Sequence, residues 1–261
     1  MRIIERDKEK IAHCERLLTE ARDLHLGPSV LATYGVDHFD KNGKQILKET
    51  GKSNSFVRNY YNLLATNALF WPTQGTVFGA GTQTPLKDYT GTVITGSMSS
   101  YPQSLHGAVV GNNRSGTVSS IAIGAQAGMY QAFQNAGTDA VKHIVVGLDD
   151  TAESFESVDL GTRIAHGTGV NQLQFGAPPN ASALYDSGTN KLTVIHSRTF
   201  TNASAAAITI KEIGLMSQIA VQSQDYTNRY LLIRDVLATP IVLEVGQTLT
   251  ISYNLSYIMS N

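Results

Sequence analysis

Apolar and polar residues alternate regularly near the C-terminal end of the chain. From Leu249 to Met259 every odd position is apolar or aromatic, and the even positions between them are polar except at Ile258. A period of two is typical of a β-strand that packs one face on a core and turns the other toward water. The pattern therefore predicts a long, half-buried strand.

Further strand-like runs precede this segment. They cover residues 144–147, 192–200, 207–215, 230–236 and 241–245. Short apolar runs with polar, turn-forming stretches between them are typical of antiparallel strands. We therefore expect the C-terminal half of the chain to form an antiparallel β domain.

A helical period is present at the other end of the chain, over residues 2–26. Gly27 and Pro28 follow it, as they commonly follow the end of a helix. The apolar positions form one stripe on an otherwise charged helix. The stripe consists of Ile4, Ile11, Cys14, Leu18 and Ala21.

Two interpretations of this helix stay open. It packs on the domain of its own chain, or it is a docking arm that binds another chain through Ile4, Ile11, Leu18 and Ala21. An isolated helix of this length is marginal in water, so the stripe needs a partner surface. Because Gly27 and Pro28 separate the helix from the β region, we predict that the partner is another chain.

A hairpin and a second helix are expected next. The turn Asp40-Lys41-Asn42-Gly43 lies between two strand-like runs, and Gly43 can adopt a positive φ. Ser53 or Ser55 can cap a helix that continues to about residue 69. Gly, Ser, Thr, Asn and Gln dominate residues 73–142, which predicts short strands or a long loop insertion.

The expected fold class is mainly β: an antiparallel β-sandwich or jelly-roll-like domain with an N-terminal helix and one further helix. A chain of 261 residues is long enough to bury one good core. The expected segments are 1–27 (helix or docking arm), 28–72 (hairpin plus helix), 73–142 (β or loop insertion) and 143–261 (antiparallel β domain). The alternative to this division is that residues 28–261 form one domain.

Charge is scarce in this sequence. Charged residues make up 16% of the chain and the formal net charge is −1, whereas about 25% charged residues is typical. Such a chain has no field that attracts nucleic acid or an anionic membrane, so neither is an expected partner. Symmetric interfaces can cover a weakly charged surface and open sheet edges, which predicts a homo-oligomer.

Cys14 is the only cysteine, which excludes an intrachain disulfide framework and a cysteine-based zinc site. The charged N-terminal segment does not resemble a secretory signal. No run approaches the roughly 18 to 20 apolar residues of a membrane-spanning helix. We expect synthesis and folding in a reducing cytoplasm.

Two loops imitate ligand-binding motifs. With His38 at position one, Asp40, Asn42, Gly43 and Glu49 occupy EF-hand positions, but position one should be Asp and the flanks look like strands. An ordinary Asn-Gly turn is the preferred interpretation. The pair Gly79 and Gly81 lacks the third glycine and the lysine of a phosphate-binding loop.

Five carboxylates follow the strand at 144–147, namely Asp149, Asp150, Glu153, Glu156 and Asp159. They could serve glycoside hydrolysis or bind a cation, but a solvated acidic loop is the preferred interpretation. The seven histidines show no zinc-binding spacing, and no G-x-S-x-G motif is present. We therefore predict no enzyme activity, no catalytic residue, no metal site and no cofactor.

Glu212 and Arg234 interrupt two otherwise apolar strands. An isolated buried charge is costly, and opposite charges on neighbouring strands lower that cost by pairing. We predict a structural ion pair in or beside the core. The alternative is that both side chains face solvent.

Several short motifs resemble a group of uncharacterised structural proteins of tailed bacteriophages. They lie within residues 34–70 and 144–258. The motifs are Ser55–Tyr60, Ile144–Gly147, Ile164–Gly167, Arg198–Asn202, Ile210–Leu215, Leu232–Leu237 and Gly246–Tyr253. The resemblance carries no functional residues across to this chain.

This resemblance implies a virion protein that assembles with copies of itself and with other virion proteins. The implied position is the tail, baseplate, collar or fibre-attachment region. A capsid decoration or head-fibre protein is one alternative. An adhesin for a host surface glycan is another, and it would need exposed aromatic residues, for which Tyr89, Tyr101, Tyr130 and Tyr185 are candidates.

Overall fold

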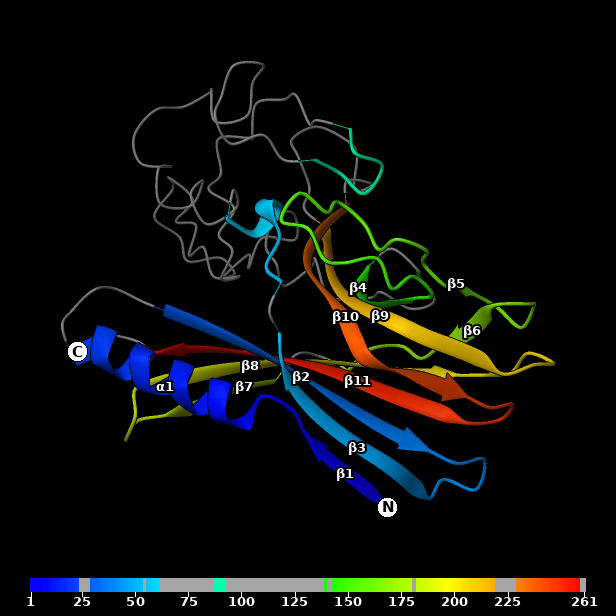
Figure 1. Cartoon of the computed structure of the whole chain (residues 1–261), viewed down its shortest axis with the longest axis horizontal. Helices are drawn as coiled ribbons and strands as arrows, with labels where there is room; N and C mark the ends of the chain where they lie inside the picture. The colour runs from blue at the N-terminus through cyan, green and yellow to red at the C-terminus, as the bar shows by residue number, and fades with distance from the viewer. Residues whose placement is uncertain are drawn as a thin grey trace, which may run out of the picture.

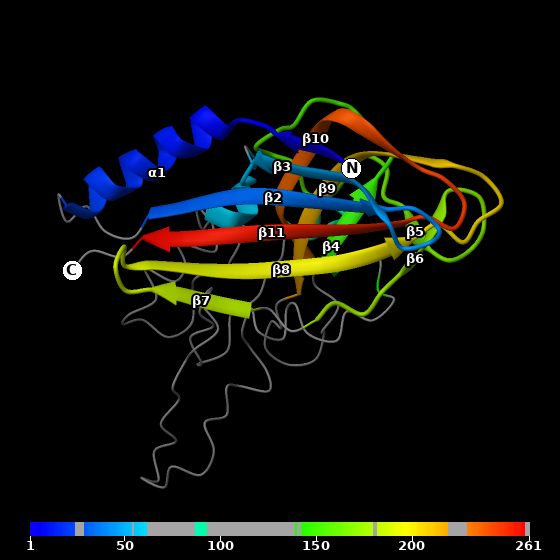
Figure 2. The same ribbon diagram turned by 90° about the horizontal axis from the view of Figure 1, so that it is seen from below.

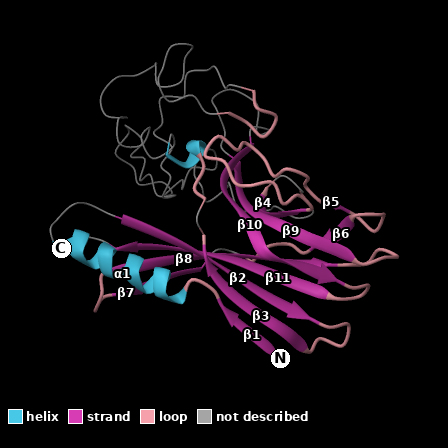
Figure 3. Ribbon diagram, in the orientation of Figure 1, coloured by secondary structure: helices cyan, strands magenta, loops and turns pink. Residues whose placement is uncertain are grey.

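The protein folds into two β-sheets packed on one another, with a helix at the N-terminal end (Figure 1, Figure 3). This is a computed structural model, which describes residues 1–23, 29–53, 55–61, 87–92, 139, 142–179, 182–218 and 229–258. The expected fold class, a mainly β sandwich with an N-terminal helix, is confirmed. A second helix begins at residues 58–61, and its expected continuation to residue 69 lies outside the described residues.

Within the described residues the larger sheet has eight strands. Its order is β1 (Arg2–Glu5), β3 (Gln45–Lys52), β2 (Ser29–Phe39), β11 (Thr248–Ile258), β8 (Lys191–Thr201), β6 (Gln172–Phe175) and β5 (Ala165–His166), with β7 (Ser182–Asp186) paired to β8. The smaller sheet has the order β10 (Arg229–Leu243), β9 (Ile208–Gln218) and β4 (His143–Gly147). Most pairs are antiparallel, but β1 pairs with β3 and β5 with β6 in parallel.

Strand β11 is the centre of the larger sheet and has the predicted alternation. Its odd residues from Leu249 to Leu255 are buried, whereas Thr250, Ser252 and Asn254 lie half-buried on the other face. It pairs with β2 on one side and β8 on the other over its whole length. Met259 lies outside the described residues.

One hydrophobic core fills the space between the sheets. Figure 2 shows the strands of the smaller sheet crossing those of the larger sheet steeply, as in orthogonal packing. Both sheets contribute: Tyr34, Val36, Phe200, Ile251 and Tyr253 from the larger, and Ile144, Ile210, Ile213, Leu215 and Leu232 from the smaller. Residues 29–53 and the described part of 143–258 therefore share one core.

A buried asparagine ties the corner where the two sheets are connected. Asn202 donates from Nδ2 to the carbonyl oxygens of Leu243, at 2.7 Å, and Ala206, at 2.9 Å. Its own backbone carbonyl accepts from Gly246 N at 2.7 Å. The β8–β9 and β10–β11 connections are thereby held side by side.

The outer face of the smaller sheet is covered as well. Residues 148–163, which we call the acidic loop, leave β4 and return beside it, with Leu148 N donating to Thr162 O at 2.8 Å. Residues 55–61 lie against β10 through the bond from Val57 N to Leu232 O at 3.1 Å. A second apolar cluster of Val57, Val145, Leu160, Met216 and Leu231 seals this layer.

The β2–β3 hairpin forms where it was expected. Gly43 has a φ of 79°, and Asp40 Oδ1 accepts hydrogen bonds from the backbone N–H groups of Asn42 and Lys44. The Asp40 carboxylate is therefore engaged within its own turn, and the flanks are strands. The structure thus favours the Asn-Gly turn over a calcium loop.

The predicted helix over residues 2–26 is wrong for its first residues. Residues 2–5 form strand β1, so Ile4 lies on a strand, and helix α1 spans Lys8–Asp23. Asp7, with a φ of 55°, separates the two and accepts the first helical hydrogen bond from Ile11 N. The β-branched Ile3-Ile4 pair favours a strand, and its spacing to Ile11 is coincidental.

Helix α1 packs on its own chain, where it contacts β2, β3 and β11 (Figure 2). Ile11 and Leu18 are half-buried, and Lys191 Nζ on β8 lies 2.9 Å from Glu15 Oε1. The side chain of Ala21 lies outside the described residues. The interpretation of residues 1–27 as an arm held apart from the β region is therefore wrong, and docking of α1 on a second chain stays a prediction.

Arg6 ties the N-terminal segment to the larger sheet, because its guanidinium pairs with the buried Glu49. Arg6→Leu should lower the free energy of unfolding by about 2 kcal/mol, since a buried carboxylate loses its cation. Urea unfolding measures the change. As a control, Lys10→Leu removes an exposed pair with Asp7 and should change stability much less than Arg6→Leu does. Equal effects of the two substitutions would contradict the role of Arg6.

Candidate functional site: a buried ion pair beneath the acidic loop

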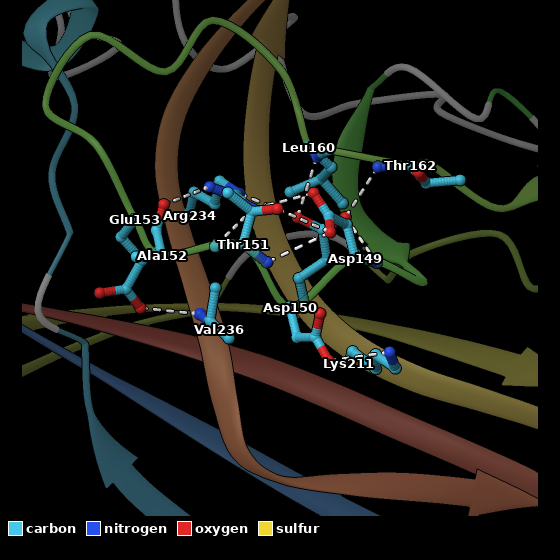
Figure 4. Close-up of polar contacts among 12 residues, drawn as sticks. Asp149, Asp150, Thr151, Ala152, Glu153, Leu160, Thr162, Lys211, Arg234 and Val236 are labelled. Atoms are coloured by element: carbon cyan, nitrogen blue, oxygen red, sulfur yellow. Dashed lines mark hydrogen bonds and ion pairs between the residues drawn. The ribbon is translucent and has the colours of Figure 1, made fainter.

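The structure brings Glu212 and Arg234 together on neighbouring strands of the smaller sheet. Arg234 Nε donates to Glu212 Oε2 at 2.8 Å, and the two residues are 4% and 0% exposed. Strand β9 carries Glu212 and strand β10 carries Arg234. The pair lies beneath the acidic loop, because Glu212 accepts from Thr162 N and Arg234 donates to Thr151 O, the latter contact being visible in Figure 4.

Every strong acceptor position of Glu212 is used. Oε1 accepts from the backbone N–H groups of Thr162, at 3.0 Å, and Asp149, at 3.3 Å. Oε2 accepts from Gly161 N at 3.0 Å in addition to Arg234. A carboxylate with two donors on each oxygen fixes the loop and is poorly placed to transfer a proton.

Arg234 holds the other side of the same loop. Its Nη2 donates to Thr151 O at 3.0 Å and its Nη1 to Ala152 O at 3.4 Å, as Figure 4 shows. Asp149 Oδ2 lies 3.9 Å from Nη2. The buried pair and the loop backbone therefore form one hydrogen-bonded unit, which we call the loop clamp.

The loop clamp leaves no space for side chains at two glycines. A Cβ atom on Gly147 would lie 2.3 Å from Glu212 Oε1, and one on Gly161 would lie 1.8 Å from Asp149 Oδ2. Both approaches are far below a normal contact. At position 147 a Cβ would also lie 2.7 Å from the backbone oxygen of Thr162, so glycine is needed there, whereas at position 161 only the side chain of Asp149 would have to move.

The five carboxylates of the acidic loop do not converge on one point. Each engages a separate group: Asp149 with Thr151, Asp150 with Lys211, Glu153 with Val236 N, Glu156 with Arg58 and Asp159 with Arg163. The described residues contain no group of three His, Cys, Asp or Glu side chains arranged to hold a metal ion. The geometry therefore favours an acidic loop whose carboxylates bind separate neighbouring groups over a catalytic or cation-binding site.

The pKa values of two of these groups follow their ion pairs, and that of a third follows its burial. The hydrogen bond from Lys211 lowers the pKa of the Asp150 carboxyl, and the one from Arg58 lowers the pKa of Glu156. Burial raises the pKa of Asp159, with Arg163 acting against it.

A second buried ionisable cluster lies where β4 meets β8, and the sequence analysis did not identify it. Arg198 is fully buried, with Nη1 donating to the carbonyl oxygens of Lys142, at 2.8 Å, and Ile144, at 3.1 Å. Its guanidinium also stacks over Phe175, 4.8 Å from the ring centre. Burial lowers the pKa of Arg198 to about 10.

Two histidines lie in the same place. The rings of His143 and His196 are 5.7 Å apart between centroids. Burial lowers the pKa of both imidazoles, to about 3 for His143, where His196 and Arg198 add to the effect, and to about 4 for His196. A usable signal existed in the sequence, since His196, Arg198 and Phe200 alternate along one strand and so share one face.

Of the four tyrosines that are candidates for an exposed aromatic surface, two fall within the described residues. Tyr185 on β7 is exposed, but Tyr89 is half-buried, with the guanidinium carbon of Arg163 5.1 Å from its ring centre. Tyr101 and Tyr130 lie outside the described residues. Exposed aromatic rings also occur at Tyr61 and Phe155, which the sequence alone did not single out.

The comparisons with known proteins find no matching family model, no matching curated protein and no matching solved structure. Among the described helices, none combines the length and the apolar character needed to cross a membrane. The fold and the site together define a two-sheet β-sandwich in which a buried ion pair fixes a loop and a buried asparagine ties a sheet corner.

Proposed function

We propose that this protein is a non-enzymatic structural component of a tailed-phage virion and assembles as a symmetric oligomer. The phage-like motifs support the proposal because they contain the residues that hold the sandwich together. Arg198, Asn202, Glu212 and Arg234 all belong to them, and all four are buried. The resemblance therefore lies in residues that maintain the fold, as expected for a protein with a structural role.

The observation that carries the assembly proposal is the open edge at β7. This strand pairs with β8 on one side within the described residues, and all five of its residues are exposed. Leu184 and Tyr185, on opposite faces, are 61% and 59% exposed. The strand has no proline and no lysine to discourage pairing, and such an edge is a template for another strand (Figure 2).

A second copy fits this edge without electrostatic conflict. An antiparallel pair of β7 strands centred on Leu184 places Asp186 opposite Ser182 of the other copy, so the two carboxylates do not face each other. Pairing of this kind is two-fold symmetric. Specific, stable interfaces bury about 1,200 Å² or more, and a five-residue edge buries much less. Further contacts in the particle must therefore add to it.

Leu184→Lys tests the edge, because a charge at the centre of the pair would face the same charge in the second copy. Wild-type protein should show concentration-dependent self-association in sedimentation velocity experiments, and Leu184→Lys should shift it to monomer. Val170→Lys is the matched control, since Val170 is 88% exposed and lies off the β7 edge. A chain that is monomeric both in solution and in the particle, or Leu184→Lys that associates as wild type does, would contradict the proposal.

Mass spectrometry of purified particles with copy number tests the virion assignment. A ring in the tail, baseplate, collar or fibre-attachment region requires a small fixed number of copies. Hundreds of copies would instead favour the capsid decoration or head-fibre alternative. Absence of the protein from particles would overturn a virion role altogether.

A further inference from the structure

Four aromatic rings form a continuous path from the core to the surface. Phe56 stacks on Tyr60 with ring centroids 4.1 Å apart, Tyr60 meets Tyr61 at 5.6 Å, and Tyr61 meets Phe155 at 5.7 Å. Tyr60 is buried, whereas Tyr61 and Phe155 are each 48% exposed. The two outer rings are therefore fixed from below and open to solvent above.

An ion pair lies against these rings, with the guanidinium of Arg58 over one face of the Phe155 ring. Arg58 Nε donates to both oxygens of Glu156, at 2.7 and 2.8 Å, and the guanidinium carbon is 5.0 Å from the centre of the Phe155 ring. Backbone contact fixes the geometry further, because Arg58 N donates to Phe155 O at 2.7 Å. The start of the second helix and the acidic loop thus build this surface jointly.

We propose that Tyr61, Phe155, Arg58 and Glu156 form a saccharide-binding platform. A sugar ring has an apolar face of C–H groups that packs on an aromatic ring, and a rim of hydroxyl groups that needs donors and acceptors. The guanidinium and the carboxylate supply both, since each keeps hydrogen-bonding capacity beyond their mutual contact. Arg58 and Glu156 are about half exposed, so hydroxyl groups can reach them.

The size of the platform distinguishes a saccharide from a protein partner. Two half-exposed rings offer roughly 200 Å² of apolar surface, given about 150 to 250 Å² for each whole side chain. That area matches one or two sugar rings, whereas a specific protein interface buries about 1,200 Å² or more. The charges of Arg58 and Glu156 cancel, which favours a neutral saccharide.

The test is binding of the full chain to an array of neutral hexose, N-acetylhexosamine and deoxyhexose oligosaccharides. Saturation-transfer NMR then measures the best-bound oligosaccharide in solution. Tyr61→Ala and Phe155→Ala should each weaken binding at least about tenfold, because each removes one stacking surface of roughly 1.4 kcal/mol or more. Tyr61→Phe keeps the ring and should retain most of the binding.

Tyr185→Ala is the matched control, because Tyr185 is exposed on β7, away from the four platform residues. It should leave saccharide binding unchanged. Urea unfolding of each variant shows whether the fold is intact, so that loss of binding can be assigned to the platform. The proposal is independent of the virion assignment, which copy number tests separately.

Three outcomes would overturn the proposal. The full chain binds no oligosaccharide on the array, or binding persists in Tyr61→Ala and Phe155→Ala. In the third outcome, binding persists in both variants and, in addition, both substitutions alter self-association of the chain. The rings would then be a contact between copies of the chain.

Discussion

Removing one member of the Glu212–Arg234 pair should lower the free energy of unfolding by about 3 to 5 kcal/mol, because the other charge is left buried without its partner. The variants Glu212→Leu and Arg234→Met serve for this test, with urea unfolding as the measurement. The double variant should cost less than the sum of the single ones, with a coupling energy of about 1 to 3 kcal/mol. Simple additivity would reject the pair as a coupled unit.

The structure also predicts that the double variant stays less stable than wild type. Glu212 accepts hydrogen bonds from three backbone N–H groups as well as from Arg234, and an apolar residue at position 212 leaves the part-buried N–H groups of Gly161 and Thr162 without this acceptor. Their amide hydrogen exchange should accelerate in both Glu212 variants. The solvent-accessible Lys211–Asp150 pair is the matched control and should show a much weaker coupling.

Stability should fall as the pH decreases from about 6.5 toward 4, because His143 and His196 are buried in the neutral form. The pKa of His143 lies at about 3 and that of His196 at about 4 in the folded chain, against about 6.5 in the unfolded chain. Below pH 6.5 the unfolded state therefore binds protons that the folded state does not bind. The expected loss by pH 4 is about 2 to 3 kcal/mol for each histidine.

Urea unfolding at a series of pH values measures this loss. His143→Asn and His196→Gln should each flatten the dependence between pH 6.5 and pH 5, where most carboxylates stay ionised. Asn suits position 143 because the backbone φ there is 67°. His13→Gln on the exposed face of α1 is the control and should leave the dependence unchanged. NMR titration that finds both imidazoles protonating near pH 6.5 in the folded chain would contradict the prediction.

The sequence was most informative where one period dominates. The alternation that begins at Leu249 placed β11 correctly, and the two interrupted apolar runs indicated that Glu212 and Arg234 lie on strands. Local turn chemistry was sufficient for the β2–β3 hairpin, because Asp40 and Gly43 act within the turn itself. These features depend on residues close together in the chain.

Features that depend on distant segments could not be predicted in the same way. The three backbone donors to Glu212 come from a loop about 50 to 60 positions earlier, and no local pattern specifies its path. The heptad spacing of Ile4 with Ile11 misled the helix prediction, since strand β1 is specified by its pairing with β3. The meeting of Tyr61 with Phe155 likewise follows from tertiary contacts alone.

The pairing of β2 with β11 has a consequence for how the chain folds during synthesis. These two strands are neighbours at the centre of the larger sheet, yet their paired residues are about 210 to 230 positions apart. At about 5 to 20 residues per second, the ribosome makes β2 roughly 10 to 40 s before its partner. During that time the edge of β2 that later pairs with β11 has no partner strand, and Leu31, Ala32 and Tyr34 are not yet covered by the core. The nascent chain is therefore open to aggregation, or to binding by a chaperone, until β11 emerges.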